Sequence, residues 1–192
     1  MHTLVAATRN QGKIREIKSL LPDFELLSLD DIGFLEETPE PYDTFEENAH
    51  TKARAVYNFC GKDVFSEDSG LCLPALQGAP GVHSAYYGGL PRSDAKNNEK
   101  LLNDLIGIED RSAYYKAIVC LIWKGEVHYF EGRCYGKIAE KPSGSNGFGY
   151  DPLFIPDGYT QSFGELPISE KQKLSHRGNA IRAMLDFLHK QV

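Results

Sequence analysis

The feature that most constrains how this chain can fold is a long apolar segment near its middle. Residues 114–123 read Tyr-Tyr-Lys-Ala-Ile-Val-Cys-Leu-Ile-Trp, and their apolar side chains do not alternate cleanly with polar ones. That pattern is typical of a strand buried on both faces. Lys124-Gly125 follows and predicts a hairpin turn into a second strand over residues 127–139, although Asn-Gly would be the stronger turn signal.

Other periodic segments predict the elements around this strand. Residues 44–60 carry apolar side chains at helical spacing, and Thr44 with Glu47 has the pattern of a capping box. Glu47 is therefore more readily a cap than a ligand. Further helices are expected at residues 14–21, 94–106 and 181–188, and further strands at residues 3–7, 25–29 and 64–70.

End signals mark the expected helix at residues 94–106. Ser93 or Asp94 is expected to cap its start, and Gly107 to stop it. Its inner face would consist of Leu101, Leu102, Leu105 and Ile106. Near the C-terminus, Ser169-Glu170-Lys171-Gln172 forms a second possible capping box.

Composition narrows the class of protein. The chain has 192 residues, 41% of them hydrophobic and 25% charged, as in a soluble globular protein of one domain or two lobes. A net charge of −6 argues against binding a nucleic acid polymer, and no apolar run is long enough to span a membrane. The four cysteines lack C-x-x-C spacing and are expected to be reduced thiols in a cytoplasmic protein: Cys60, Cys72, Cys120 and Cys134.

Two adjacent carboxylates, Glu67 and Asp68, stand where an apolar run ends in Ser69-Gly70. In a continuous strand, neighbouring side chains point to opposite faces. We expect the strand to break at Asp68, with Gly70 turning the backbone, so that both carboxylates reach one hard cation such as Mg²⁺. A solvated turn is the alternative.

Other polar segments offer ligand-binding groups. Residues 8–13 link a strand to a helix start, where backbone N–H groups hold anions, although Lys13 could be a plain surface lysine. Asn48 and Lys52 lie one helical turn apart and could present an amide and an ammonium to a ligand. The acidic loop at residues 33–41 is either solvated or a source of ligands.

The C-terminal half adds two more such segments. Residues 143–152 place glycines around two aromatic side chains, which suits either stacking on a planar ligand or an irregular turn. His176 and Arg177 are expected in a polar break just ahead of the last helix, with Lys171 upstream. Arginine suits bidentate contacts with a phosphate or a base edge.

Six sequence motifs occur in order along the chain. They are residues 7–13 with Glu16; residues 44–49 with Lys52-Ala53; residues 67–71; residues 78–81 with Ser84-Ala85; residues 147–152; and residues 175–178. Together they resemble the inosine triphosphatase family, the non-canonical purine nucleoside triphosphate pyrophosphatases. Two residues depart from the family pattern: Arg9 stands where glycine is more usual, and Glu67 where many bacterial relatives carry aspartate.

The resemblance implies an α/β fold over residues 1–192, with a long mixed, twisted sheet, flanking helices and two lobes around a central active-site cleft. It implies hydrolysis of ITP, dITP and XTP to the monophosphate and pyrophosphate. The expected cofactor is Mg²⁺, and the expected partners are purine nucleoside triphosphates and a second copy of the chain in a homodimer.

The resemblance also gives roles to residues. Asp68 would be the general base or the principal metal carboxylate, and the sequence does not divide these roles. Glu67 would lie near the metal, and either Glu36 or Glu37 would complete its ligands. The residues expected to contact the nucleotide are Thr8, Arg9, Asn10, Gln11, Gly12, Lys13, Lys52, Ser69, Phe148, Gly149, Tyr150, Asp151, Lys171, His176 and Arg177.

Several alternatives remain open on the sequence. His176 and Arg177 could read the six-position carbonyl of the base; alternatively, Arg177 binds phosphate and His176 supports the loop. Hydrogen bonds to that carbonyl would discriminate against adenine. A second enzymatic hypothesis is a Maf-like pyrophosphatase that acts on pyrimidine or modified nucleotides. A non-enzymatic hypothesis is a nucleotide-binding module without turnover.

Overall fold

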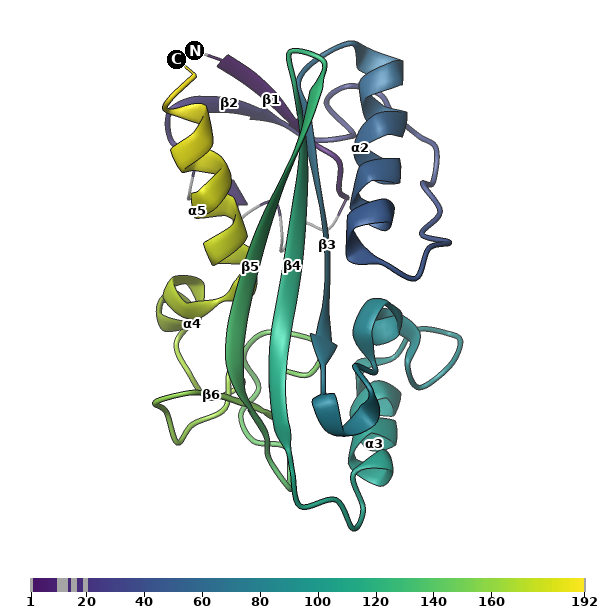
Figure 1. Cartoon of the computed structure of the whole chain (residues 1–192), viewed down its shortest axis with the longest axis vertical. Coiled ribbons are helices and arrows are strands. Elements are labelled where there is room, and N and C mark those ends of the chain that lie inside the picture. The colour runs from purple at the N-terminus through teal and green to yellow at the C-terminus, as the bar shows by residue number, and fades with distance from the viewer. Residues whose placement is uncertain (1, 10–13, 15–16, 19–20, 192) are drawn as a thin grey trace. The chain divides into compact units, whose positions relative to one another are not determined.

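The described residues form one mixed sheet of six strands in the order β2-β1-β3-β4-β5-β6 (Figure 1). The structure is a computed structural model, and it describes residues 2–9, 14, 17–18 and 21–191. The strands are β1 (His2–Ala6), β2 (Phe24–Leu27), β3 (Val64–Cys72), β4 (Ser112–Trp123), β5 (Glu126–Ile138) and β6 (Phe154–Pro156). The helices are α2 (Phe45–Cys60), α3 (Asp94–Asp104), α4 (Ile168–Leu174) and α5 (His176–Leu188), with 3₁₀ turns η1 (Pro74–Leu76) and η2 (Gly81–Tyr86).

The chain divides into two compact units. Unit 1 consists of residues 1–68, 117–132 and 177–192, and unit 2 of residues 69–116 and 133–176. The long strands β3, β4 and β5 each contribute residues to both units. β1 pairs in parallel with β2 and β3, whereas β5 pairs with β6 in antiparallel fashion. The mixed sheet with flanking helices therefore matches the predicted fold class.

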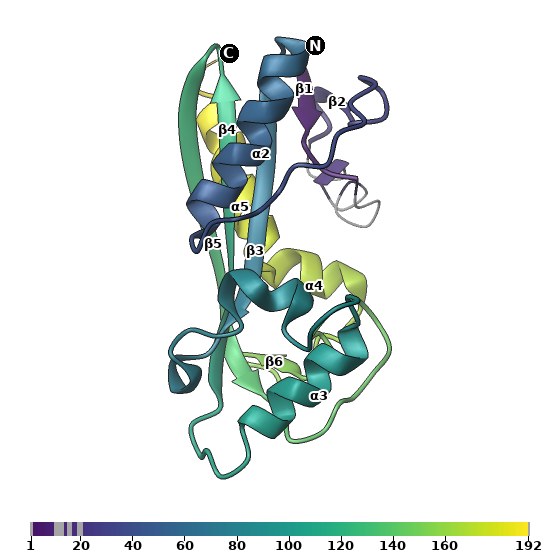
Figure 2. The ribbon, with the colours of Figure 1, turned by 90° about the vertical axis from the view of Figure 1, so that its right-hand side faces the viewer.

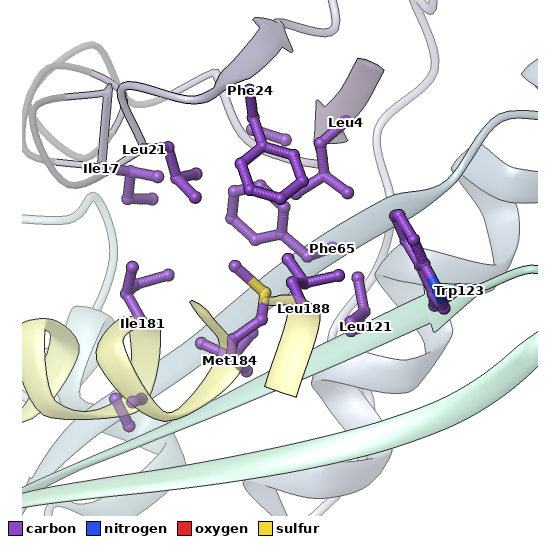
Figure 3. Close-up of a cluster of buried hydrophobic side chains, with 14 residues drawn as sticks. Leu4, Ile17, Leu21, Phe24, Phe65, Leu121, Trp123, Ile181, Met184 and Leu188 are labelled. Carbon is purple, nitrogen blue, oxygen red and sulfur yellow. The ribbon is translucent and has the colours of Figure 1, made fainter. Parts of the chain in front are cut away.

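Unit 1 carries helices on both faces of its part of the sheet. Figures 1 and 2 show α2 on one side of β3 and β4 and α5 on the other. On the α5 side, Met184 and Ile181 pack with Leu4 and Phe65 in a buried apolar cluster (Figure 3). On the α2 side, the Ser66 hydroxyl donates a hydrogen bond to the Ala49 carbonyl. Layers on both faces explain why the apolar segment of β4 has no alternation, and residues 117–123 are all buried.

The local signals at α2 and at the hairpin are confirmed. Thr44 is the N-cap of α2: its Oγ1 accepts from the Glu47 N–H at 3.2 Å and donates to the Glu47 carboxylate at 2.6 Å. Between β4 and β5, Lys124 and Gly125 have φ of 50° and 87°. Two consecutive positive φ angles are typical of a type I′ hairpin turn.

Unit 2 has its own apolar core. Leu101 of α3 and Leu105, its C-cap, are buried there with Tyr115, Phe154 and other residues. Ser93 caps α3 by accepting from the Lys96 N–H. The prediction that Ile106 lies on the inner face is wrong, because α3 ends at Asp104 and Ile106 is 77% exposed.

The second capping box and the predicted break in the strand are also wrong. α4 begins behind Pro167, and Ser169 lies inside the helix with no side-chain cap at its start. β3 does not break at Asp68 but continues to Cys72. A Cβ on Gly70 would lie 2.1 Å from the Gly81 carbonyl oxygen, so glycine is required there for close packing of η2 against β3.

Other expectations bear on chemistry and location. All four cysteines are free thiols, and Cys72, Cys120 and Cys134 are buried. Among the residues that the structure describes, no helix is long and apolar enough to cross a membrane. The predicted ligand residues Asn10, Gln11, Gly12 and Lys13, and half of the predicted helix at 14–21, lie outside the described residues.

We predict that Gly70→Ala lowers the free energy of unfolding by about 1–3 kcal/mol or more, because the new methyl group collides with backbone that cannot swing aside. Denaturant unfolding of the variant and its parent measures the difference. Ser145→Ala, at an exposed position, is the control and should unfold like the parent. Equal stability of Gly70→Ala and the parent would mean that η2 does not pack rigidly on β3.

Candidate functional site

The two adjacent carboxylates on β3 point to different helices. Glu67 forms an ion pair with Arg177 in the first turn of α5, with Oε2 3.3 Å from Nε and Oε1 3.3 Å from Nη2. Asp68 pairs with Lys52 of α2, with Oδ1 3.4 Å from Nζ. This is the alternation expected of an uninterrupted strand. Each buried carboxylate therefore has its own counter-ion.

Lys52 is the centre of the polar group on the α2 side of unit 1. Its ammonium lies 2.5 Å from the Glu40 carboxylate and 3.0 Å from the Glu67 carbonyl oxygen, in addition to its contact with Asp68. Burial by itself would lower the pKa of Lys52, but the carboxylates of Asp68, Glu40 and Glu67 outweigh it and the pKa is raised. Lys52 is thus a fixed positive charge at neutral pH.

Asn48 determines where the acidic loop meets α2. Its side-chain amide donates to the Tyr42 carbonyl at 2.9 Å and accepts from the Tyr42 N–H at 3.0 Å. The sequence suggests that this amide could be presented to a ligand. In the structure it is buried and holds the loop. This clamp lies two residues after Glu40 and explains how that carboxylate reaches Lys52.

Glu40 contacts the Lys52 ammonium, and the sequence did not identify it as a candidate. Three glutamates occur in the acidic loop. The prediction of a metal ligand was made for the two adjacent ones, Glu36 and Glu37. The only signal for Glu40 was indirect, since Asn48 and Lys52 stand one turn apart and clamp the residues around it. Glu36 and Glu37 are exposed, and the Glu40 side chain is itself 44% exposed, so the contact with Lys52 is what distinguishes Glu40. Within the described part of the chain, no group of three or more Asp, Glu, His or Cys side chains is arranged to hold a metal ion.

Arg9 also holds the acidic loop. Its guanidinium donates to the carbonyl oxygens of Phe34 at 2.6 Å and Glu36 at 3.1 Å. Just before it, the Ala7 N–H donates to the Phe65 carbonyl and the Thr8 N–H to the Ala6 carbonyl, so the end of β1 is anchored to β3. Arg9 therefore binds backbone carbonyls in this structure.

Unit 2 contains a second charged group. The ammonium of Lys171, a residue of α4, lies 2.7 Å from Asp151 Oδ2. Lys171 is 8% exposed and Asp151 is 2% exposed. It also lies 4.6 Å from the centre of the Phe148 ring and 5.7 Å from that of Phe163, at cation–π distance. The same Asp151 oxygen accepts from the Phe148 N–H at 2.8 Å. Three predicted contact residues are thus brought together.

His176 and Arg177 occupy the first turn of α5, so the predicted polar break ahead of the helix is reduced to Ser175. The His176 ring is 5% exposed and stacks on Tyr115, with ring centres 4.7 Å apart and planes 10° apart. Arg177 is 2% exposed. Both side chains are therefore set by packing within the protein.

The remaining predicted contact residues lie in β3 and in the glycine-rich loop. Ser69 is half-buried in β3, directly after Asp68. Tyr150 is a buried core residue whose hydroxyl donates to the Ser84 carbonyl at 2.8 Å, and burial raises its pKa. Gly149 bonds through its backbone to α3.

Chemically, unit 1 offers oxygen donors and a fixed ammonium. Carboxylates such as those of Asp68 and Glu40 are ligands that hard divalent cations prefer, and Lys52 can stabilise anionic oxygens. Unit 2 offers the half-exposed Phe148 ring, to which a planar group could bind. Taken separately, the first capability suits a phosphate group and the second a base.

Comparison with known proteins is consistent with this chemistry. A protein of Christiangramia forsetii described as dITP/XTP pyrophosphatase is 48% identical over 188 residues, which cover 97% of this chain and 99% of the relative. A protein of Aliarcobacter butzleri with the same description is 42% identical over 193 residues, covering 96% and 97%.

Solved structures are equally similar. The structure of the Staphylococcus aureus Ham1 protein matches 99% of this chain and all of its own, with a TM-score of 0.92 and 37% identity. A nucleoside-triphosphatase or dITP/XTP pyrophosphatase from Mycobacterium abscessus matches 95% of this chain and 98% of its own, with a TM-score of 0.80 and 41% identity. The Ham1 family model matches residues 4–187. Since that match spans nearly the whole chain, and the relatives are similar over nearly their full length, this protein belongs to the Ham1 family.

Proposed function

We propose that this protein hydrolyses non-canonical purine nucleoside triphosphates, namely ITP, dITP and XTP, to the monophosphate and pyrophosphate. The observation that carries the proposal is similarity over nearly the full length to proteins described as dITP/XTP pyrophosphatases. The charged groups around Lys52 and Lys171 agree with it, since a triphosphate needs fixed cations and a purine needs a flat apolar surface.

Mg²⁺ is the proposed cofactor, and the residues on the α2 side of β3 fit it. Oxygens of Asp68 and Glu40 already converge on one cationic centre, the Lys52 ammonium, so their positions suit a shared positive charge. Asp68 and Glu40 would hold the ion. When bound, Mg²⁺ would neutralise phosphate charge and polarise the phosphorus centre that is attacked.

The chain's own residues supply the rest of the proposed reaction. Asp68 orients the attacking water and takes its proton, and Lys52 stabilises the negative charge that develops on the leaving pyrophosphate. Lys171 and Phe148 contact the nucleotide, together with the loop around Asp151. Glu67 and Arg177 neutralise each other and keep the start of α5 in place.

The three readings of the sequence differ in their products. Pyrophosphate and orthophosphate released from ITP, XTP, dUTP and GTP with Mg²⁺ should be measured separately. The proposal expects pyrophosphate from ITP and XTP, with little from GTP or dUTP. Preference for dUTP would indicate a Maf-like enzyme, and binding of ITP without turnover would indicate a non-catalytic module. The proposed homodimer is checked independently by light scattering of the purified protein.

Asp68→Asn should reduce ITP turnover by about 100-fold or more while the fold is retained, because an amide neither takes a proton nor neutralises a metal ion. Steady-state pyrophosphate release measures the loss, and unfolding curves verify the fold. Asp186→Asn, on the exposed side of α5, is the matched control. Turnover within a few-fold of the parent in Asp68→Asn would remove Asp68 from the proposed mechanism.

Glu40→Gln should raise the Mg²⁺ concentration needed for half-maximal activity by about 10-fold or more, because one charged ligand is lost. Glu36→Gln and Glu37→Gln form the comparison set, since the sequence pointed to those residues. Magnesium titrations of all three variants at saturating ITP decide between them. A shift in Glu36→Gln or Glu37→Gln, with none in Glu40→Gln, would contradict our choice of Glu40.

Arg177→Met should lower the free energy of unfolding by about 3–5 kcal/mol, because it leaves the Glu67 carboxylate buried without its counter-ion. The double variant Glu67→Gln/Arg177→Met should be less destabilised than the sum of the single variants. Arg182→Met, on the same helix, is the control. Additive effects in this cycle would mean that the ion pair does not couple β3 to α5.

A further inference from the structure

The glycine-rich loop is held at a single residue by α3. Gly149 has a φ of +64°, and a Cβ built on it would meet nothing within 4 Å. Glycine is therefore suited to this position by its backbone angle and not by lack of space. Because a glycine backbone is intrinsically free, some other contact has to fix the orientation of the peptides on either side of it.

Two side chains of α3 supply that contact. Asp94 Oδ2 accepts a hydrogen bond from the Gly149 N–H at 2.8 Å, and Asn98 Nδ2 donates one to the Gly149 carbonyl at 3.1 Å. The two side chains lie one helical turn apart on the same face. Both backbone groups of one loop residue are thus bound by neighbouring side chains, which fixes its orientation as well as its position.

The sequence of α3 is arranged for this purpose. Ser93 is the N-cap, so Asp94 is free of capping and its carboxylate is available to the loop. The face that buries Leu101 continues towards the N-terminus as polar residues, the buried Asn97 among them. Asn97 holds a second segment by accepting from the Gly88 N–H and donating to the carbonyls of Ser84 and Ala85. Tyr150, next to Gly149, donates to the same Ser84 carbonyl.

The residues on either side of Gly149 carry the charged and aromatic groups of unit 2. The Phe148 ring is 41% exposed and has the Lys171 ammonium 4.6 Å from its centre. Asp151 accepts from both the Phe148 N–H and Lys171. A rotation of the Gly149 peptides would therefore move the Phe148 ring relative to Lys171.

We propose that Asp94 and Asn98 are positioning residues for nucleotide binding. They fix Gly149 and thereby the Phe148 ring and its approach to Lys171, and they act through these residues without touching the substrate. The proposal rests on the proposed function, since it assumes that a purine nucleotide binds the loop.

The test compares the KM and kcat of Asp94→Ala and Asn98→Ala for ITP. Each should raise KM by about 10-fold, the factor that corresponds to losing one well-formed hydrogen bond, while kcat stays within about threefold of the parent. Hydrogen exchange of a peptide covering residues 146–152 should be faster in both variants, because the loop has lost an anchor. Glu99→Ala, on the exposed side of α3, should leave KM and exchange unchanged.

Conservative variants separate positioning from support of the helix. Asp94→Asn keeps an oxygen acceptor and should restore KM to near the parent value, whereas Asn98→Asp sets a carboxylate against the Gly149 carbonyl and should bind ITP more weakly than Asn98→Ala. Unchanged KM in both alanine variants, or Asp94→Asn as weak as Asp94→Ala, would overturn the positioning role and leave the proposed function intact. A parent that releases no pyrophosphate from ITP would overturn the proposed function, and the positioning role in nucleotide binding with it.

Discussion

The structure of unit 1 depends on the alternation of side chains along a strand that is covered on both faces. In β3, Phe65 and Glu67 face α5, whereas Ser66 and Asp68 face α2. Carboxylates buried on opposite faces of a sheet need separate cations in direct contact with them, because an uncompensated buried charge is costly. Each helix must therefore bring a cation to the strand. α2 supplies Lys52 and α5 supplies Arg177. The charge balance of β3 therefore depends on where both helices lie.

A similar division of tasks holds within the elements that carry the polar groups. α2 buries alanines and Val56 along one side, and uses Asn48 and Lys52 to hold the acidic loop. α3 buries leucines in its second half and binds loops with polar side chains in its first half. In both helices a buried polar residue is fully engaged with backbone groups, which is how such residues avoid the cost of desolvation. Loops that would otherwise be mobile are thus fixed by helices.

Periodicity and end signals predicted the elements well, because they are local. The capping box at Thr44, the buried strand at residues 114–123 and the turn at Lys124-Gly125 are all as expected. Predictions were wrong where the structure of a segment depends on partners that are distant in the sequence. Ser69-Gly70 has turn composition, yet it lies within a strand because η2 packs against Gly70. Glu40 and Asn98 gave no local signal, since their partners lie in other segments. The family resemblance supplied the candidate residues for the site instead.

The opposite orientation of Glu67 and Asp68 has a consequence for how this protein can change over evolution or in the laboratory. Residues adjacent in sequence usually share an environment, so a substitution at one constrains the other. Here the side chains point to different helices: the Glu67 carboxylate pairs with Arg177 of α5, and the Asp68 carboxylate belongs to a set of oxygens around the Lys52 ammonium of α2. A substitution of the Glu67 side chain should therefore act first on α5, whereas one of the Asp68 side chain should act first on the oxygens around Lys52.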